Sequence, residues 1–326
     1  MPLEFFIRPD IQPPPFGISH ADRLLLVGSC FTSNVGKQLE DLKFSVKHNP
    51  TGILFDPFSV VRHLRDALEN KKYNTSDLAL RDEVWHSYNH HTDFSSTDAE
   101  QTVGKINKAI AETSDFLKQA DILFLTLGSA FYYRLAESNE RVANCHRFPS
   151  QTFTKHLAKI EDIVYEFKQL IDDIRTQNPS IKIVFTVSPV RHIREGVVNN
   201  NRSKARLLEA VHQLCEVLEN TYYFPAYELV IDVLRDYRFY DVDMVHPNYP
   251  ATQFVFEQFR NTFFNAETLS LCERVKELVT AYRHKPNFPD TEAHRKFIAA
   301  NLQKIITLEP LTPLVNWEME KEYFSS

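Results

Sequence analysis

The chain has 326 residues, of which 43% are hydrophobic and 25% are charged, an ordinary composition for a globular protein. Its formal net charge of −6 argues against a nucleic-acid partner, and no apolar run approaches the ~20 residues that span a bilayer. The first residues do not resemble a signal peptide, and the four cysteines show neither disulfide-framework nor CxxC spacing. We therefore expect a cytoplasmic protein with reduced thiols and no membrane partner.

The first half of the chain predicts two strands, each followed by a helix. Residues 1–20 are rich in proline and predict an extended arm. The apolar run 23–28 predicts a buried strand that ends at Gly28, and the amphipathic segment after it predicts a helix to about residue 42. A strand over 44–48 and a helix from Pro57 follow. Alternation near residues 83–88 predicts a small hairpin outside the main sheet.

The second half continues the alternation of strands and helices. Strands are predicted over 121–127, 181–187 and 224–231, and helices over 98–119, 153–177, 203–219, 251–265, 267–282 and 291–305, before an irregular tail from residue 308. Five strands alternating with helices predict an α/β fold, a three-layer α/β/α arrangement around a five-stranded parallel sheet, with additional C-terminal helices.

Glycine is scarce, with 7 residues where average usage would give about 23. Gly28, Gly52 and Gly128 lie near the ends of predicted strands, so each is expected to meet a backbone requirement there. Ser29 and Cys30 follow the first of these glycines, at the carboxyl end of the first strand. Open α/β sheets bind their ligands at this edge.

Several short blocks together resemble the GSCFA-domain family, a bacterial family grouped with the SGNH/GDSL-type hydrolases. They are Gly28-Ser29-Cys30-Phe31, Asn49-Pro50-Thr51-Gly52, Gly128-Ser129-Ala130, Asn144-Cys145-His146, Ser188-Pro189-Val190-Arg191-His192 and Asp243-Met244-Val245-His246-Pro247. The resemblance implies the flavodoxin-like strand order 2-1-3-4-5. With no linker or repeat in the chain, we expect one catalytic domain over 1–265 and a C-terminal helical appendage over 266–326.

The nucleophile has two candidates in this interpretation. SGNH hydrolases carry Gly-Asp-Ser at the end of the first strand, so aligning their glycine with Gly28 places Cys30 at the serine position. A register shifted by one residue would make Ser29 the nucleophile instead. A helix N-terminus and a neighbouring histidine both favour a thiolate, which predicts a lowered pKa for Cys30. The alternative is that Cys30 is a small packing residue.

Asp243 and His246 are the candidate orienter and general base. A spacing of three residues on a turn can place a carboxylate beside an imidazole, where it holds the ring and stabilises the imidazolium. The alternative is that both side chains merely cap the loop. The family resemblance, in which this is the last block, favours the catalytic role.

Donors for an oxyanion are less well specified. The resemblance implies the backbone N–H groups of the nucleophile turn and of Gly52. The asparagine of the third SGNH block is missing, and Ser129, Asn49 or Asn144 could replace it. Arg191 could bind an anionic substrate group or form an ion pair with Glu195 or Asp236. His192 is interpreted as a satisfied loop histidine.

These residues predict an acyl esterase or acyltransferase that acts on a small-molecule or carbohydrate acyl ester. No cofactor is expected, because the chain has neither a P-loop nor GxGxxG, and no convincing set of metal ligands is present. One alternative is a non-catalytic carbohydrate- or acyl-binding module on the same scaffold. Another is a structural or assembly protein that uses the C-terminal helices. The sequence does not predict the oligomeric state.

Overall fold

The computed structural model describes residue 7 and residues 9–325, so the first part of the predicted N-terminal arm lies outside the described residues. Residues 9–20 contain no helix or strand, but they are anchored to the body of the protein. Ile18 is buried, and its N–H donates to the carbonyl of Phe263 over 2.7 Å.

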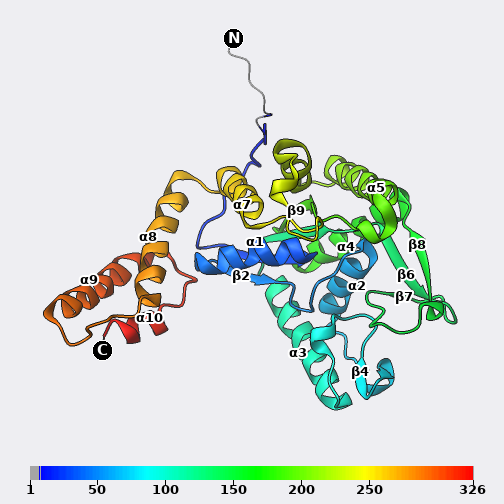
Figure 1. The fold of residues 1–326 in the computed structure, drawn as a ribbon, viewed down its shortest axis with the longest axis horizontal. Helices are drawn as coiled ribbons and strands as arrows, with labels where there is room; N and C mark the ends of the chain where they lie inside the picture. Colours follow the sequence, from blue (N-terminus) through cyan, green and yellow to red (C-terminus); the bar gives the residue numbers. More distant parts are fainter. Residues whose placement is uncertain (1–6, 8, 326) are drawn as a thin grey trace, which may run out of the picture.

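A five-stranded parallel sheet lies at the centre of the molecule (Figure 1). Its spatial order is β10-β9-β5-β1-β2, which is the predicted order 2-1-3-4-5 when these five strands are counted along the chain. The strands are β1 (Arg23–Gly28), β2 (Ser45–His48), β5 (Ile122–Leu127), β9 (Lys182–Val187) and β10 (Thr221–Tyr223). All four neighbouring pairs are parallel, which confirms the predicted fold class.

Helices cover both faces of this sheet, because alternate side chains of each strand point to opposite sides. Leu25 and Val27 pack with α2 (Pro57–Leu68), α4 (Ile160–Gln177) and α5 (Gly196–Val217). Leu24 and Leu26 pack with α1 (Cys30–Asp41) and α7 (Tyr249–Phe263). Another helix, α3 (Ala99–Leu117), contacts the layer of α2, α4 and α5 through Leu117.

Two smaller sheets lie outside the central one. The predicted hairpin is confirmed as β3 (Ala79–Arg81) and β4 (Val84–His86). The second sheet, of β6 (Phe131–Leu135), β7 (Arg141–Val142) and β8 (Phe153–Leu157), was not predicted. Residues 153–157 were assigned to the following helix, which was wrong, because they pair with β6 and the helix begins only at Ile160.

Two other predicted elements also differ from the structure. The fifth strand was predicted over 224–231, which was wrong, because β10 ends at Tyr223 and residues 226–234 form α6 (Ala226–Glu228) and a π-helical turn (Leu229–Leu234). The tail from residue 308 was predicted to be irregular, but it contains α10 (Glu318–Tyr323). In both segments apolar side chains such as Val230 and Trp317 are buried against helices. The helical conformation therefore follows from tertiary packing and not from the local sequence pattern.

Helices α8 (Ala266–Arg283), α9 (Glu292–Leu308) and α10 extend from one side of the sheet domain (Figure 1). They enclose a separate apolar cluster that includes Leu278, Ile305 and Trp317. The division of domains at residue 265 stays a prediction. None of the described helices is long and apolar enough to cross a membrane.

Candidate active site

The turn between β1 and α1 holds Ser29 and Cys30 at the carboxyl edge of the sheet. Gly28 has φ of +145°, and a Cβ there would lie 2.1 Å from the carbonyl oxygen of Thr126, so only glycine fits. The N–H of Ser29 donates to the same carbonyl over 3.1 Å. Asn49 accepts from the Gly28 N–H (2.8 Å) and donates to the Ser29 carbonyl (3.3 Å) and to Ser33 Oγ (2.9 Å). The Asn49 amide therefore holds the turn and has no donor left for an oxyanion.

Burial distinguishes the two candidate nucleophiles. Ser29 is 1% exposed and its Oγ has no hydrogen-bond partner, whereas Cys30 is partly exposed at the first position of α1. Burial raises the pKa of the Cys30 thiol, although the N–H groups of Cys30 and Phe31 and the charge of Lys204 act to lower it. The predicted lowered pKa was therefore wrong, because desolvation outweighs the helix N-terminus. Burial raises the pKa of Cys145 to about 11, and those of Cys215 and Cys272 to about 12.

Asp243 and His246 form a hydrogen-bonded pair on the loop before α7. The His246 ring donates from Nδ1 to Asp243 Oδ2 over 2.6 Å, and Oδ1 accepts from the backbone N–H groups of Val245 (2.8 Å) and His246 (3.0 Å). These hydrogen bonds, with that of the His246 ring first, lower the pKa of Asp243 to about 2. Both side chains are about half exposed. The arrangement leaves Nε2 of His246 as the nitrogen that can accept a proton.

The backbone brings this loop to the carboxyl end of β9. Arg191, which follows β9, donates its N–H to the carbonyl of Val245 over 3.2 Å, and so fastens the His246 loop to the sheet edge. Its guanidinium lies 4.2 Å from the ring centre of Tyr240. Of the two suggested ion pairs, that with Asp236 does not occur among the described residues, and this carboxylate lies 3.5 Å from Arg238 instead. The side chain of Glu195 lies outside the described part of the chain.

Two further residues, neither of them predicted to act in the site, lie at the same edge. Lys204 of α5 is 1% exposed and donates from Nζ to the carbonyls of Gly128 and Ser188, each over 2.6 Å. Burial lowers its pKa to about 7. The sequence does contain a signal for this buried lysine. Lys204 lies on the apolar face of the helix, one turn before Leu207, and Val211 and Leu214 continue the same face.

His192 is the second of these residues. Burial, followed by the charges of Lys204 and His246, lowers its pKa to about 4. Its Nε2 is buried without a hydrogen-bond partner, so the interpretation as a satisfied loop histidine was wrong. Within the described residues, no hydrogen bond joins His246 to Cys30 or to Ser29. The charge of Lys204 acts on the pKa values of both Cys30 and His192, which lie on the two sides of the site.

The other proposed oxyanion donors already make hydrogen bonds, although among the described residues the Asn144 amide does so only through its oxygen. The Gly52 N–H donates to the carbonyl of Asn49 over 2.8 Å. Ser129 Oγ accepts from the N–H of Phe131 (3.0 Å) and lies 3.3 Å from the hydroxyl of Ser203. Asn144 accepts from the N–H of His146 (2.9 Å) in the loop after β7. The N–H groups of Cys30 and Phe31, which act on the Cys30 sulfur, are the donors that the turn itself supplies.

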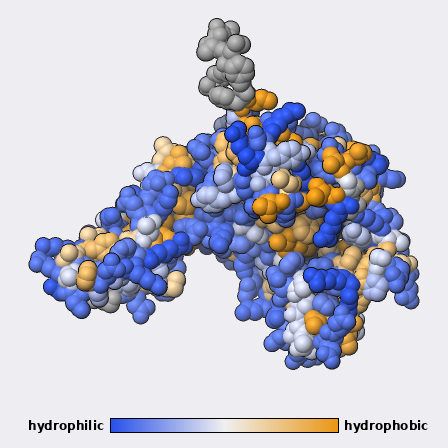
Figure 2. Space-filling view, in the orientation of Figure 1, coloured by the Kyte–Doolittle hydropathy of each residue, from blue (hydrophilic) through white to orange (hydrophobic). Residues whose placement is uncertain are grey.

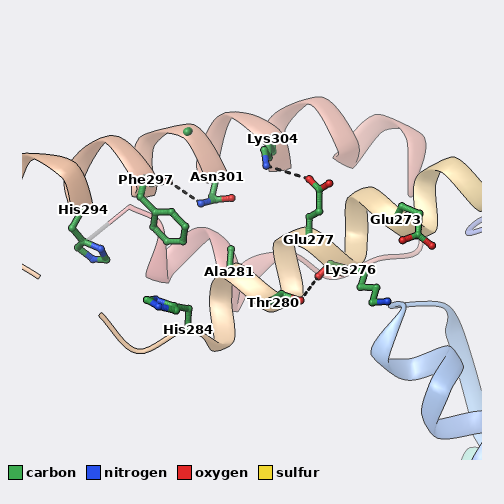
Figure 3. A pocket seen from close by; sticks show the side chains of 11 residues that line it. Glu273, Lys276, Glu277, Thr280, Ala281, His284, His294, Phe297, Asn301 and Lys304 are labelled. Atoms are coloured by element: carbon green, nitrogen blue, oxygen red, sulfur yellow. Dashed lines mark hydrogen bonds and ion pairs between the residues drawn. The ribbon is translucent and has the colours of Figure 1, made fainter. Parts of the chain in front are cut away.

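A cavity of ≈ 730 Å³ lies between α8 and α9, away from these groups. Figure 3 shows the Phe297 ring at one end, flanked by His284 and His294, while Lys304 pairs with Glu277 over 3.3 Å farther along. The residues that line this cavity include no cysteine or serine. Among all described residues, no group of three or more His, Cys, Asp or Glu side chains could hold a metal ion.

Solved structures similar to this chain include three esterases. A mutant acetyl esterase with acetate ion has a TM-score of 0.35 at 12% identity, covering 78% of this chain and 99% of the other. A carbohydrate esterase of family 3 from Talaromyces cellulolyticus has a TM-score of 0.36 at 11% identity, covering 77% and 98%. The acetyl xylan esterase Est2A from Butyrivibrio proteoclasticus has a TM-score of 0.39 at 12% identity, covering 76% and 65%.

No curated protein matches the chain. The profile described as "GSCFA family" matches residues 23–259, which contain the nucleophile turn and the Asp243–His246 pair. The profile described as "GSCFA domain protein, C-terminal domain" matches residues 275–326. The first match covers more than half of the sequence, and the chain therefore belongs to the GSCFA family.

Proposed function

We propose that this protein is an SGNH-like acyl esterase or acyltransferase, with Cys30 as nucleophile, His246 as general base and Asp243 as orienter. The observation that carries the proposal is the 2.6 Å contact between Asp243 and His246, on a loop fastened to the same sheet edge as the Cys30 turn. Such a pair has one protonated nitrogen held by the carboxylate and one free nitrogen for proton transfer. The partial exposure of Cys30 favours it over the enclosed Ser29.

The reaction would proceed in two acyl transfers. His246 takes the proton of the Cys30 thiol as the sulfur attacks the acyl carbon; a C–S bond forms, and the carbonyl electron pair moves to an oxyanion that the N–H groups at the start of α1 stabilise. The C–O bond to the leaving alcohol then breaks, and the alcohol takes a proton from His246. Water or an acceptor alcohol, deprotonated by His246, attacks the thioester and releases the acid or new ester together with the Cys30 thiolate.

His246 must approach Cys30 for these proton transfers, and its position on a half-exposed loop supports such a movement. Apolar side chains on the loops around it are exposed, including Ile193 (45%), Val242 (98%) and Met244 (48%). Figure 2 shows hydrophobic residues gathered near the centre of the drawn face, where Figure 1 labels β9. This surface suits an acyl substituent on a small-molecule or carbohydrate substrate.

Turnover of an aryl ester and mass spectrometry of the protein after incubation with acyl donors test the proposal. We expect Cys30→Ala and His246→Ala each to lower kcat/KM by about 10³-fold or more, since members of a triad act as a unit. Ser29→Ala should have a milder effect, and Cys145→Ala, the matched control at another partly buried cysteine, should leave turnover unchanged. An acyl adduct should appear on Cys30. Activity lost in Ser29→Ala and kept in Cys30→Ala would place the nucleophile one residue earlier.

A non-catalytic acyl- or carbohydrate-binding module is the second candidate. The engaged side chains of Asn49 and Ser129 and the engaged N–H of Gly52 favour it, because they leave few donors for an oxyanion. Absence of both turnover and adduct, with saturable binding of an acylated sugar, would support this candidate.

A further inference from the structure

Lys204 is a buried cation whose charge the fold does not neutralise with a carboxylate. Its side chain is 1% exposed, and its two hydrogen bonds at 2.6 Å go to neutral carbonyl groups, those of Gly128 and Ser188. In the part of the chain that the structure describes, no Asp or Glu side chain forms an ion pair with it. Burying an ammonium group without an anion is unfavourable, so such a lysine is expected to have another partner.

Backbone geometry places Lys204 beside the nucleophile turn. The two carbonyls that it binds lie just past the carboxyl ends of β5 and β9, which are neighbouring strands. The turn at Ser29 and Cys30 is hydrogen-bonded to the same end of β5. The Ser29 N–H donates to the carbonyl of Thr126, two residues before Gly128. Cys30 is the next residue after Ser29 and the first residue of α1, and the charge of Lys204 acts to lower the pKa of its thiol.

The other titratable groups that face Lys204 supply no opposing charge near neutral pH. His192, on the loop after β9, feels the charge of Lys204, which contributes to keeping its imidazole neutral. The ring of Tyr227 on α6 lies 5.9 Å from Nζ, and burial raises its pKa. Cys30, at the start of α1, is thus the group here whose ionised form would oppose the charge of Lys204, although burial raises the pKa of its thiol.

We infer that Lys204 is the buried counter-ion of the Cys30 thiolate, and that this pair, rather than the start of α1 alone, makes the nucleophile. The inference rests on the role of Cys30 in the proposed function. Protonated Lys204 favours loss of the proton from Cys30, and the thiolate in turn keeps Lys204 protonated, so the two groups titrate as a unit. In this role Lys204 is a positioning residue that touches no reacting atom. Its two hydrogen bonds also connect the carboxyl ends of β5 and β9.

Site-resolved alkylation of the four cysteines with iodoacetamide, measured across a range of pH, tests this inference without any acyl substrate. In Lys204→Met the alkylation midpoint of Cys30 should move to higher pH, and a move of one pH unit lowers the rate constant at neutral pH by about tenfold. Lys204→Arg, which keeps a cation, should restore most of the rate. Lys37→Met, which removes an exposed charge from the same helix α1 as Cys30, should leave the Cys30 profile unchanged. The alkylation profile of Cys145 should be the same in every variant.

An unchanged Cys30 profile in folded Lys204→Met overturns the inference. If that variant does not fold, Cys30→Ala gives the reciprocal measurement. The folded pKa of Lys204 is lowered to about 7, below the unfolded value of 10.5, so the unfolding free energy of the wild type should rise between these pH values. Without the thiolate the rise should begin at lower pH, and an unchanged pH dependence would also overturn the inference. If Lys204→Met shifts the alkylation profile of Cys30 but the wild type turns over no acyl ester, the ion pair is supported and the proposed function is rejected.

Discussion

Two consecutive side chains at the end of β1 have different surroundings although they share one turn. The Ser29 hydroxyl is enclosed and unpartnered, while the Cys30 thiol lies at the first position of α1, partly exposed and near Lys204. Ser29 is the N-cap of α1 with an extended backbone (φ −71°, ψ 175°), and Cys30 is the first helical residue. A difference of one residue therefore decides which group a substrate can reach.

The Asp243 carboxylate is expected to act on activity through the imidazole that it holds. Asp243→Asn would replace the acceptor of the Nδ1 proton and favour the wrong tautomer of His246. We expect kcat/KM for an activated ester to fall by about 10²- to 10⁴-fold, with little change in KM. Steady-state kinetics at several pH values would measure this.

Asp241→Asn provides the matched control, because Asp241 is exposed on the same loop and makes no side-chain contact with His246 in the described residues. It should retain nearly full activity. Equal losses in both variants would show that the loop charge, and not the hydrogen bond to His246, matters.

At the scale of elements, buried histidines lie in α2 and in the segment around β4, where each makes a local contact. His63 of α2 is hydrogen-bonded to Thr51 over 2.6 Å, and His90 to Ser87 over 2.8 Å. The ring of His86 stacks on that of His146 at 4.6 Å. Burial lowers the pKa values of His63 and His90 to about 3, so both rings are neutral in the folded protein near neutral pH.

Acid is therefore expected to destabilise the folded protein through these buried rings. The unfolded chain binds protons at these histidines below pH 6.5, whereas the folded protein binds them only near pH 3. The unfolding free energy should be unaffected by them above pH 6.5 and should fall as the pH drops toward 3, with each histidine adding a slope of up to about 1.4 kcal/mol per pH unit. Denaturant unfolding at a series of pH values measures the slope.

Substitution of one buried histidine should remove its share of this pH dependence. His63→Gln should lower the slope by about one proton. His284→Gln, at an exposed position, should not change it. Identical slopes in the wild type and His63→Gln would mean that His63 does not resist protonation in the folded state.

At the scale of the whole molecule, the C-terminal helices are joined to the sheet domain by a partly buried ion pair. Lys43, just after α1, contacts the carboxylate of Glu320 over 2.6 Å, and its ammonium lies 5.0 Å from the centre of the Trp317 ring. Glu320 is 2% exposed and its second carboxylate oxygen has no partner. A more exposed pair, Arg283 with Asp41, lies beside the same helix. The junction thus depends strongly on Lys43.

Removal of the Lys43 charge should destabilise the protein more than removal of an exposed charge from the same region. Lys43→Met leaves the Glu320 carboxylate buried and unpaired, which is expected to lower the unfolding free energy by about 3 kcal/mol. Lys321→Met breaks the exposed pair with Glu309 and should cost at most about 1 kcal/mol. Denaturant unfolding compares the two, and equal losses would contradict a structural role for the Lys43–Glu320 pair.

Local sequence was enough to predict four of the five central strands, the turn at Ser29 and Cys30, and the Asp243–His246 pair. Each depends on neighbouring residues alone: apolar runs form buried strands, Gly28 supplies a conformation that other residues resist, and a carboxylate three residues before a histidine reaches its ring on a turn. The strand order came from the family resemblance and agrees with the structure.

The remaining features depend on how distant segments pack together. The sheet of β6, β7 and β8 needs pairing between segments about 20 residues apart, and a short segment of mixed polarity such as 153–157 suits a strand or a helix equally well. The pKa of Cys30 depends on how much of the thiol is desolvated, which local sequence does not contain. Lys204 joins the site because α5 packs its apolar face on the sheet and carries the lysine to the ends of β5 and β9, far from Cys30 along the chain.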